Sequence, residues 1–422
     1  MTARTVWASE ARLRTVPWGA LSGVGPALAE PLAAVLAGRP AERVLDRFLR
    51  DHRELDRDGR AAVAEAIFGV GLWRRRLAFQ LEREDACPRL LLAALLRDLG
   101  GMDGAAAERA AGLTPGALPP PRPPPRELAL RFSMPDWLAE TLVREVGPEA
   151  EALADALGLP GPVCLRPNLL QIGAEALAAR LAAEGVATRP GEIVPSALVV
   201  TSHRPNLYAL PAMREGLLEV QDEGSQLVGA LVAASPGESV LDLCAGAGGK
   251  ALQLAAAVGL TGAVHATDAN RSRLDRLARR ALRAGAGSII RVHGESPPPG
   301  LLVDAALVDA PCSELGALRR GPDLRFRLDP RAFDPLPRLQ LSLLARAADH
   351  VRRGGRLVYA TCTLRREENE EVALAFERAQ PGFTRLPAGA LAARGGANGG
   401  FLRTWPHRQG CDGFFAAVWR RG

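Results

Sequence analysis

Ser239-Val-Leu-Asp-Leu-Cys-Ala-Gly-Ala-Gly-Gly-Lys250 is the part of the chain from which the fold is best inferred. Its apolar first half predicts a buried strand, its glycines a tight turn, and residues 251–258 a helix that begins directly after the turn. Glycines let the backbone approach a ligand closely, and the free N–H groups of a helix N-terminus can bind it. Asp268, at the end of the next predicted strand, suits the two hydroxyls of a ribose. The segment therefore predicts a nucleoside-containing cofactor in an α/β domain.

Two kinds of cofactor use a loop of this type. A dinucleotide site usually has the pattern G-x-G-x-x-G and a helix directed at a pyrophosphate. This loop instead has the sequence A-G-A-G-G-K, and Asp242 precedes it. A carboxylate there complements the sulfonium and the ammonium group of S-adenosylmethionine, so we favour this methyl donor. A glycine-rich turn without any ligand is the alternative.

The α/β pattern extends on both sides of the loop. Strand-like runs alternate with helical stretches and lie at residues 240–244, 263–267, 289–292, 305–309 and 357–361. This alternation predicts a doubly wound, mainly parallel sheet. An apolar run at residues 414–419 predicts one further strand late in the chain.

A proline-rich segment divides the chain upstream of this domain. In Thr114–Pro125, seven of twelve residues are prolines, which cannot continue a helix. Apolar residues at helical spacing before it predict an all-α domain, and mixed short strands and helices after it predict a small α/β segment. The expected divisions are residues 1–113 (all-α), 114–126 (linker), 127–215 (small α/β) and 216–422 (catalytic).

The composition is that of a folded protein with two or three domains: 422 residues, 47% hydrophobic and 24% charged. The net charge of +6 permits a polyanionic partner without requiring one. The six cysteines stand at least 49 residues apart and lack zinc-ligand spacing, so we expect no metal and a reduced, cytoplasmic protein. The longest aliphatic run, residues 90–96, is too short to span a bilayer, so no membrane association is expected. Lys250 is the only lysine among 53 cationic residues, which indicates a need for an ammonium group.

Two cysteines follow neighbouring strands of the predicted sheet. Cys312 lies in D-A-P-C-S, which begins at Asp309, and Cys362 lies in A-T-C-T. Ligands of open parallel sheets bind beyond the carboxyl ends of the strands, so both thiols are expected beside the cofactor loop. A lone cysteine at a strand end is usually a small core residue. Two of them beside a cofactor loop favour a catalytic role.

Two thiols beside a methyl donor fit methylation of carbon 5 of cytosine. That carbon is a weak nucleophile until a thiolate adds to carbon 6 and pushes electron density onto it. Asp309 would hold or protonate the ring at nitrogen 3 and so stabilise the adduct. The second cysteine would assist release of the product, and the base must be unstacked to expose both carbons. The residues alone do not show which cysteine attacks, because both could form thiolates.

The motifs D-L-C-A-G-A-G-G-K, D-A-P-C-S, A-T-C-T and R-E-E-N, with V-Q-D-E-G-S-Q-L at Val220–Leu227, occur in this order. Together they resemble the Sun-type (RsmB-like) RNA cytosine-5 methyltransferases over about residues 160–422, and Glu54–Leu77 resembles the NusB-like helical domain of that family. The resemblance implies a Rossmann-like, S-adenosylmethionine-dependent methyltransferase domain. It further implies a preceding small RRM-like α/β segment and an all-α, NusB-like, RNA-binding N-terminal domain.

The resemblance also implies roles for single residues. Cys362 would be the nucleophile, Cys312 would aid product release, and Asp309 would serve both the base and the cofactor. The expected cofactor-binding residues are Cys244, Ala245, Gly246, Ala247, Gly248, Gly249, Lys250, Asp268, Glu295 and Asp309.

Three positions depart from the family's pattern. Ala247 stands where the loop usually has proline, and a small residue still fits there. Glu295 stands where an aspartate is expected near the adenine, and its side chain is longer. Glu314-Leu315-Gly316 replaces Gly-Thr-Gly and adds bulk on the substrate side.

Two charged stretches remain. Arg319, Arg320 and Arg325 follow Cys312 in an arginine-rich stretch and are expected to bind RNA phosphates. A solvated loop tethered by aspartates is the alternative. The acidic run at residues 367–371 is expected in the first turns of a helix, where the dipole favours negative charge, and is given no catalytic role.

The predicted function is methylation of carbon 5 of a cytosine in RNA by a monomeric, cytoplasmic enzyme. The NusB-like domain favours ribosomal RNA, and transfer RNA is the alternative substrate with the same chemistry. A catalytically inactive RNA-binding assembly factor is the alternative from another class, suggested by the departures at residues 295 and 314–316. A small-molecule methyltransferase or an NAD enzyme would leave the cysteine pair unexplained.

Overall fold

The computed structural model describes residues 6–202, 205–387 and 397–422. Its internal contacts divide the chain into two compact units. Unit 1 contains Met1–Pro160 and Leu318–Pro330, and unit 2 contains Gly161–Ala317 and Arg331–Gly422. The segment 318–330 therefore interrupts unit 2 in sequence and packs within unit 1.

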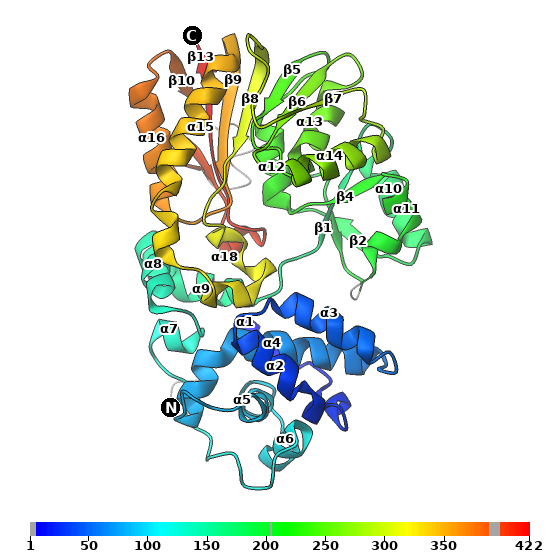
Figure 1. The fold of residues 1–422 in the computed structure, drawn as a ribbon, viewed down its shortest axis with the longest axis vertical. Coiled ribbons are helices and arrows are strands. Elements are labelled where there is room, and N and C mark those ends of the chain that lie inside the picture. Colours follow the sequence, from blue (N-terminus) through cyan, green and yellow to red (C-terminus); the bar gives the residue numbers. More distant parts are fainter. Residues whose placement is uncertain (1–5, 203–204, 388–396) are drawn as a thin grey trace. The chain divides into compact units, whose positions relative to one another are not determined.

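The described part of unit 1 is helical (Figure 1). Its longest helix, α4 (Arg57–Leu81), begins after Asp56, whose carboxylate accepts a hydrogen bond from the Gly59 N–H (2.7 Å). The helix buries Trp73 and Leu77 in the core of the unit and ends at Glu82, which has a left-handed conformation (φ 54°). The other α-helices are α1 (Ala8–Leu13), α2 (Ala29–Leu36), α3 (Ala41–Asp51), α5 (Pro88–Ala94), α6 (Gly104–Ala111), α7 (Leu128–Arg131), α8 (Asp136–Val146) and α9 (Ala150–Gly158). Single turns are η1 (Trp18–Leu21), η2 (Gly25–Leu28), η3 (Leu95–Leu99), η4 (Gly147–Glu149) and η7 (Pro322–Phe326).

Helices α7, α8 and α9 pack within unit 1, although the sequence analysis assigns residues 127–215 to one α/β segment. α7 contacts α4, and α9 contacts α1, where the Ser9 hydroxyl donates to Asp155 Oδ1 (2.5 Å). The proline-rich segment shows where the chain is extended. It does not show which unit the helices after it join.

Unit 2 begins with a small antiparallel sheet in the order β2-β3-β1-β4. Its strands are β1 (Cys164–Pro167), β2 (Thr188–Pro190), β3 (Leu198–Val200) and β4 (Leu218–Val220), and its helices are α10 (Ala174–Ala183) and α11 (Pro211–Arg214), with the turn η5 (Leu207–Ala209). β4 lies just after the expected boundary at residue 215. The small sheet therefore extends into the segment that the sequence analysis assigns to the catalytic domain.

The large sheet of unit 2 is nine-stranded, with the order β11-β12-β13-β9-β8-β5-β6-β7 and β10 paired to β13. Strands β9, β8, β5, β6 and β7 are parallel, and β13 pairs antiparallel to β9. The strands are β5 (Ser239–Asp242), β6 (Ala263–Thr267), β7 (Ile290–Gly294), β8 (Val303–Asp309), β9 (Val351–Thr361), β10 (Phe383–Leu386), β11 (Ala397–Asn398), β12 (Phe401–Arg403) and β13 (Phe415–Arg421). The predicted parallel sheet and its late extra strand are thus present.

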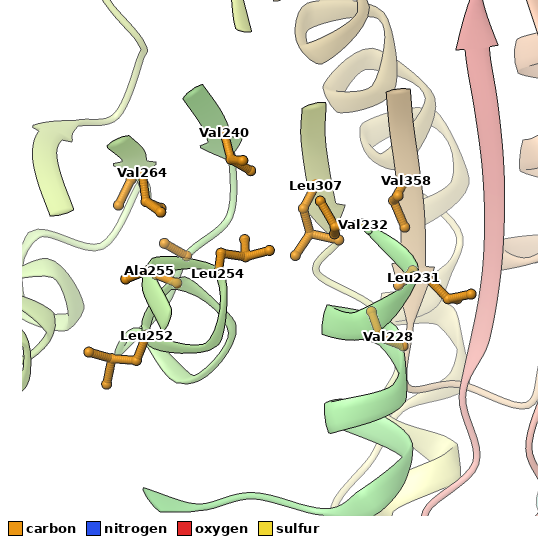
Figure 2. Packing of buried hydrophobic residues seen from close by; sticks show 14 of the residues in the cluster. Val228, Leu231, Val232, Val240, Leu252, Leu254, Ala255, Val264, Leu307 and Val358 are labelled. Carbon is orange, nitrogen blue, oxygen red and sulfur yellow. The ribbon is translucent and has the colours of Figure 1, made fainter. Parts of the chain in front are cut away.

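Helices cover both faces of the large sheet. Successive strand residues alternate between two buried clusters, as with Val240 on one face and Leu241 on the other. Figure 2 shows Val228 of α12 and Leu254 of α13 in the cluster that also contains Val240. The helices are α12 (Glu223–Leu231), α13 (Gly249–Val258), α14 (Arg271–Arg283), α15 (Leu336–His350), α16 (Glu370–Ala379) and α18 (Pro406–Gln409), with turns η6 (Leu315–Arg320), η8 (Pro330–Phe333) and η9 (Arg366–Glu368). Within the described ranges, no helix combines the length and apolarity needed to cross a bilayer.

Candidate active site

The strand order reverses between β5 and β8, and this switch point is where open α/β sheets bind ligands. A cavity of about 360 Å³ opens at the carboxyl ends of these strands and of β9. Ten of the predicted site residues line it: Cys244, Ala245, Gly246, Ala247, Gly249, Lys250, Asp268, Asp309, Cys312 and Cys362. The topology thus brings together residues that lie more than a hundred positions apart in sequence.

A second cavity of about 670 Å³ adjoins the first and shares Cys244 and Asp268 with it. Glu295 lines this second cavity together with apolar side chains of α15, among them Leu339 and Leu343. An apolar wall beside a carboxylate suits a flat, hydrogen-bonding base. Glu295 is therefore separated from the thiols and lies where the adenine end of the cofactor is expected.

Gly248 lines neither cavity. It has φ +93°, and a Cβ there would lie 2.8 Å from Leu277 Cγ of α14. Both the left-handed backbone and the close contact require glycine. Gly248 therefore allows close packing of the loop against α14, and its expected contact with the cofactor stays a prediction.

Asp242 is a buried carboxylate at the end of β5 and lines the first cavity. Among the described residues, none gives either of its oxygens a hydrogen bond of normal geometry. Burial first, and the charge of Asp309 second, raise the pKa of Asp242 to about 7, against the opposing effects of Lys250 and of the Cys244 backbone N–H. A buried carboxylate that faces a cavity and has no hydrogen-bond donor of its own is suited to bind a cationic group there.

Lys250 forms an ion pair in the same cavity. Its Nζ lies 2.7 Å from Asp309 Oδ2 and 5.5 Å from the centre of the Phe414 ring. The lysine comes from the first turn of α13 and the aspartate from the end of β8. The single lysine of the chain therefore has a defined partner, and that partner is the aspartate expected to hold the base.

The two strand-end thiols are in contact. Cys312 Sγ and Cys362 Sγ lie 3.5 Å apart, and both side chains are partly exposed in the cavity. The hydrogen bond with Cys312, followed by burial, raises the pKa of the Cys362 thiol well above its usual range. In the absence of substrate, Cys362 is consequently a protonated thiol at neutral pH.

The cofactor loop is held by arginines that the sequence analysis missed. Arg166 of β1 donates to the Gly249 carbonyl (2.5 Å) and to the Gln221 side chain. Arg280 of α14 donates to the Ala247 carbonyl (2.5 Å). Burial lowers the pKa of Arg166 to about 10. Because Arg166 lies 83 residues from Gly249 in sequence, no local pattern could have indicated this contact.

The expected RNA contacts of Arg319 and Arg325 are wrong, because both side chains are buried. Arg325 packs within unit 1 and donates to the carbonyls of Leu157 (2.9 Å) and Phe132 (3.4 Å). Burial lowers its pKa to about 10. Arg320 is exposed, so its contact with RNA stays a prediction.

The acidic run also differs from its expected role. Glu368 lies in the turn η9 before α16 and not in the first turn of that helix, and 0% of its surface is exposed. It ends η9 and hydrogen-bonds Ser313, the residue after Cys312. Glu370 does begin α16, where it pairs with Arg403 (2.7 Å). Charge spacing alone did not distinguish the buried Glu368 from the other glutamates of the run, which are partly or fully exposed.

The chain is similar to known proteins over most of its length. A family model described as 16S rRNA methyltransferase RsmB/F matches residues 230–420, and a model described as an RsmF/B-like ferredoxin-like domain matches residues 134–206. The probable ribosomal RNA small subunit methyltransferase B of Synechocystis sp. is 35% identical over 299 residues, covering 69% of this chain and 67% of that protein. The ribosomal RNA small subunit methyltransferase B of Thermus thermophilus is 34% identical over 414 residues, covering 92% of this chain and 96% of that protein.

Solved structures have the same fold. A methyltransferase homologue from Pyrococcus horikoshii has a TM-score of 0.60 at 26% identity, covering 70% of this chain and 97% of that one. NSun6 from the same organism, solved with SFG, has a TM-score of 0.61 at 21% identity, covering 68% of this chain and 98% of that one.

The parallel sheet, the glycine loop and the cavity at the switch point define a Rossmann-like, S-adenosylmethionine-dependent methyltransferase. The small sheet before it corresponds to the ferredoxin-like domain of such enzymes. The chain belongs to the RsmB/F family of 16S rRNA methyltransferases. The predicted fold class, cofactor and family are confirmed.

Proposed function

We propose that this chain methylates carbon 5 of a cytosine in ribosomal RNA, with Cys362 as the nucleophile. The observation that carries the proposal is the 3.5 Å contact between the Cys312 and Cys362 thiols, in the cavity that also holds the Lys250–Asp309 pair. Curated relatives named as ribosomal RNA small subunit methyltransferases support the substrate class. A monomeric enzyme acting in the cytoplasm without a metal is part of the same proposal.

The residues of the two cavities fit S-adenosylmethionine. Asp242 would accept hydrogen bonds from the amino group, because its oxygens have no other donor of normal geometry among the described residues. Asp268, whose carboxylate holds the Gly246 and Asn270 N–H groups, has lone pairs left for the ribose hydroxyls. Glu295 would lie at the adenine. When bound, S-adenosylmethionine supplies an electrophilic methyl group.

Addition begins at Cys362. Its Sγ would bond to carbon 6 of the cytosine as the thiol proton passes to the Asp309 carboxylate, which shares it with nitrogen 3, and the C5–C6 π pair would move onto carbon 5. The raised pKa of Cys362 means that the proton leaves only as substrate binds and the adduct forms. Asp309 would hold the ring at nitrogen 3, and Lys250 Nζ, 2.7 Å away, fixes the position of that carboxylate.

Release reverses the addition. Once carbon 5 is methylated, its C–H electron pair would restore the C5–C6 double bond, and the bond from carbon 6 to Cys362 Sγ would break with its pair on sulfur. Cys312 would give its thiol proton to the departing sulfur and take up the proton from carbon 5. Cys312 would assist this step, since its Sγ is the neighbour of Cys362 Sγ at 3.5 Å. The assignment of the two roles to these two cysteines comes from the family resemblance.

Single-cysteine variants test the mechanism. Cys312→Ala should accumulate an RNA–protein adduct that survives a denaturing gel, because addition proceeds and release fails. Cys362→Ala should give neither adduct nor methylation. Cys87→Ala, which removes an exposed thiol of unit 1, is the matched control and should behave as wild type. If the two active-site variants behaved in reverse, Cys312 would be the nucleophile and Cys362 would assist release.

Bisulfite sequencing of RNA from a deletion strain tests the substrate. One cytosine signal should be lost from the small-subunit ribosomal RNA. A loss in transfer RNA instead would favour the second candidate substrate, and an unchanged pattern would contradict the proposal. Calorimetric titration with S-adenosylmethionine addresses the third candidate, since an inactive assembly factor is favoured only if no binding is found.

A further inference from the structure

Glu368 is a fully buried carboxylate outside the cavity, and both of its oxygens are occupied. Oε2 accepts hydrogen bonds from the Ser313 N–H (2.9 Å) and from Gln340 Nε2 (3.0 Å). Oε1 accepts one from the Ser313 hydroxyl (2.6 Å). Gln340 Nε2 also donates to the Pro311 carbonyl (2.9 Å). The residues on both sides of Cys312 are therefore held by Glu368, one directly and one through Gln340.

Asn369, the next residue, makes the corresponding contacts around Cys362. Its Oδ1 accepts a hydrogen bond from the Thr361 hydroxyl (2.5 Å), and its Nδ2 donates to the Thr363 carbonyl (3.0 Å). Asn369 is also fully buried. Two consecutive residues thus hold the neighbours of two cysteines that lie 50 residues apart.

A hydroxyl chain connects the two cysteine loops. Ser313 Oγ and Thr363 Oγ1 lie 2.7 Å apart, and each residue directly follows an active-site cysteine. An ionised carboxylate only accepts hydrogen bonds, so the Ser313 hydroxyl donates to Glu368 and must accept from Thr363. Thr363 Oγ1 in turn accepts from the Arg365 N–H (3.3 Å). The hydrogen bond from Ser313 to Glu368 therefore fixes the direction of the bond between Thr363 and Ser313.

We propose that Glu368 and Asn369 are positioning residues that set the separation of the Cys312 and Cys362 thiols; this rests on the proposed covalent mechanism. Both thiols act in turn on one cytosine ring, so their relative position determines whether release follows addition. A displacement of about 1 Å at a reacting group can cost about 100-fold in rate. Burying a carboxylate is costly unless donors surround it. Here two of the donors, the Ser313 N–H and hydroxyl, belong to the Cys312 loop, and the side chains of Gln340 and Arg365 supply the others.

The test compares Glu368→Gln with Glu371→Gln. Glu371 lies three residues later, is exposed, and pairs at the surface with Arg366. Glutamine at position 368 keeps the size of the side chain, but one of the two accepting oxygens becomes an NH₂ group, which cannot accept a hydrogen bond. We expect kcat to fall roughly 100-fold with KM for S-adenosylmethionine within about twofold of wild type. Glu371→Gln should match wild type in both.

A second measurement does not depend on methylation. Phenylarsine oxide binds adjacent thiols, and its affinity can be followed by protection of Cys312 and Cys362 from alkylation in mass spectra. Glu368→Gln should weaken this binding at least about tenfold. Gln340→Met removes the two hydrogen bonds that Gln340 donates and leaves both contacts of Glu368 with Ser313, so it should weaken the binding less. Melting curves of each variant verify folding.

The outcomes separate the two proposals. Wild-type arsenical affinity and wild-type kcat in Glu368→Gln, or an equal loss in Glu371→Gln, would overturn the positioning role. Loss of arsenical affinity in Glu368→Gln would support it even if the wild-type protein methylated no cytosine, and in that case only the proposed function would fail.

Discussion

Two buried carboxylates of unit 2 differ in how their charge is compensated. Asp242, at the end of β5, is 1% exposed, and among the described residues no group gives either oxygen a hydrogen bond of normal geometry. Glu368, at the end of η9, is 0% exposed, and both of its oxygens accept hydrogen bonds. A buried charge without partners destabilises the fold until a ligand supplies them, whereas one with partners fixes the groups around it. From this difference we expect Asp242 to bind a ligand and Glu368 to position the backbone.

Asp242→Asn tests the first half of the comparison and has the largest expected effect. The amide keeps the shape but loses the charge that attracts an ammonium group, and a hydrogen bond to a charged group contributes about 2–3 kcal/mol. The dissociation constant of S-adenosylmethionine, measured by calorimetry, should rise roughly 100-fold. A rise below about threefold would mean that Asp242 does not hold the cofactor.

The same variant should be more stable than wild type without cofactor. The pKa of Asp242 is raised from 3.8 to about 7, so the folded protein ionises this group at higher pH than the unfolded chain. The stability of the wild type therefore falls between about pH 4 and pH 7 and is lowest above that range. At pH 8, Asp242→Asn should raise Tm by about 5 °C. At pH 5, where Asp242 is neutral, the advantage should disappear, and a difference independent of pH would contradict the assigned cause.

Arg166→Met sharpens the comparison. If the partners of Asp242 come from the bound cofactor, the cofactor loop must already be held in place before the cofactor binds. Arg166 donates to the Gly249 carbonyl at 2.5 Å. Losing this donor should raise the dissociation constant of S-adenosylmethionine by about tenfold. Arg189→Met, at an exposed position of the same small sheet, is the control and should bind as wild type. Equal effects of the two substitutions would show that the contact with Gly249 is not the cause.

Of these substitutions, Glu368→Gln should have the smallest effect on the affinity for S-adenosylmethionine. Its contacts are with Ser313 and Gln340, and it lines neither cavity. The dissociation constant of S-adenosylmethionine should therefore stay within about twofold of wild type, which calorimetry can verify. A loss as large as that of Asp242→Asn would remove the distinction between the two carboxylates.

Local sequence was sufficient to predict the sheet and to bring most of the predicted site residues to one cavity. The strand, glycine turn and helix at Ser239–Lys250 are properties of consecutive residues, and parallel strands place their carboxyl ends together. The motifs that follow β8 and β9 could therefore be assigned to the same edge of the sheet from the strand pattern alone. Even the glycine loop held one exception, since Gly248 packs against Leu277 instead of lining the cavity.

The remaining features depend on contacts that no local pattern encodes. Arg325 was expected on the surface because arginines usually are, but its partners Phe132 and Leu157 lie 193 and 168 residues away. Glu368 looked like its exposed neighbours, and its partner Ser313 lies 55 residues away. For charged residues, the sequence shows the charge, and only the tertiary contacts show whether water, protein or ligand compensates it.

The segment 318–330 has a consequence for synthesis of the chain. It packs within unit 1, where Arg325 donates to the Leu157 carbonyl, although residues 161–317 of unit 2 are translated before it. At translation rates of about 5–20 residues per second, the intervening stretch takes roughly 10–30 s to emerge from the ribosome. The N-terminal unit consequently completes its core only after the cofactor-binding half of the methyltransferase unit has been made, so the usual order of domain-by-domain folding from the N-terminus does not apply to this chain.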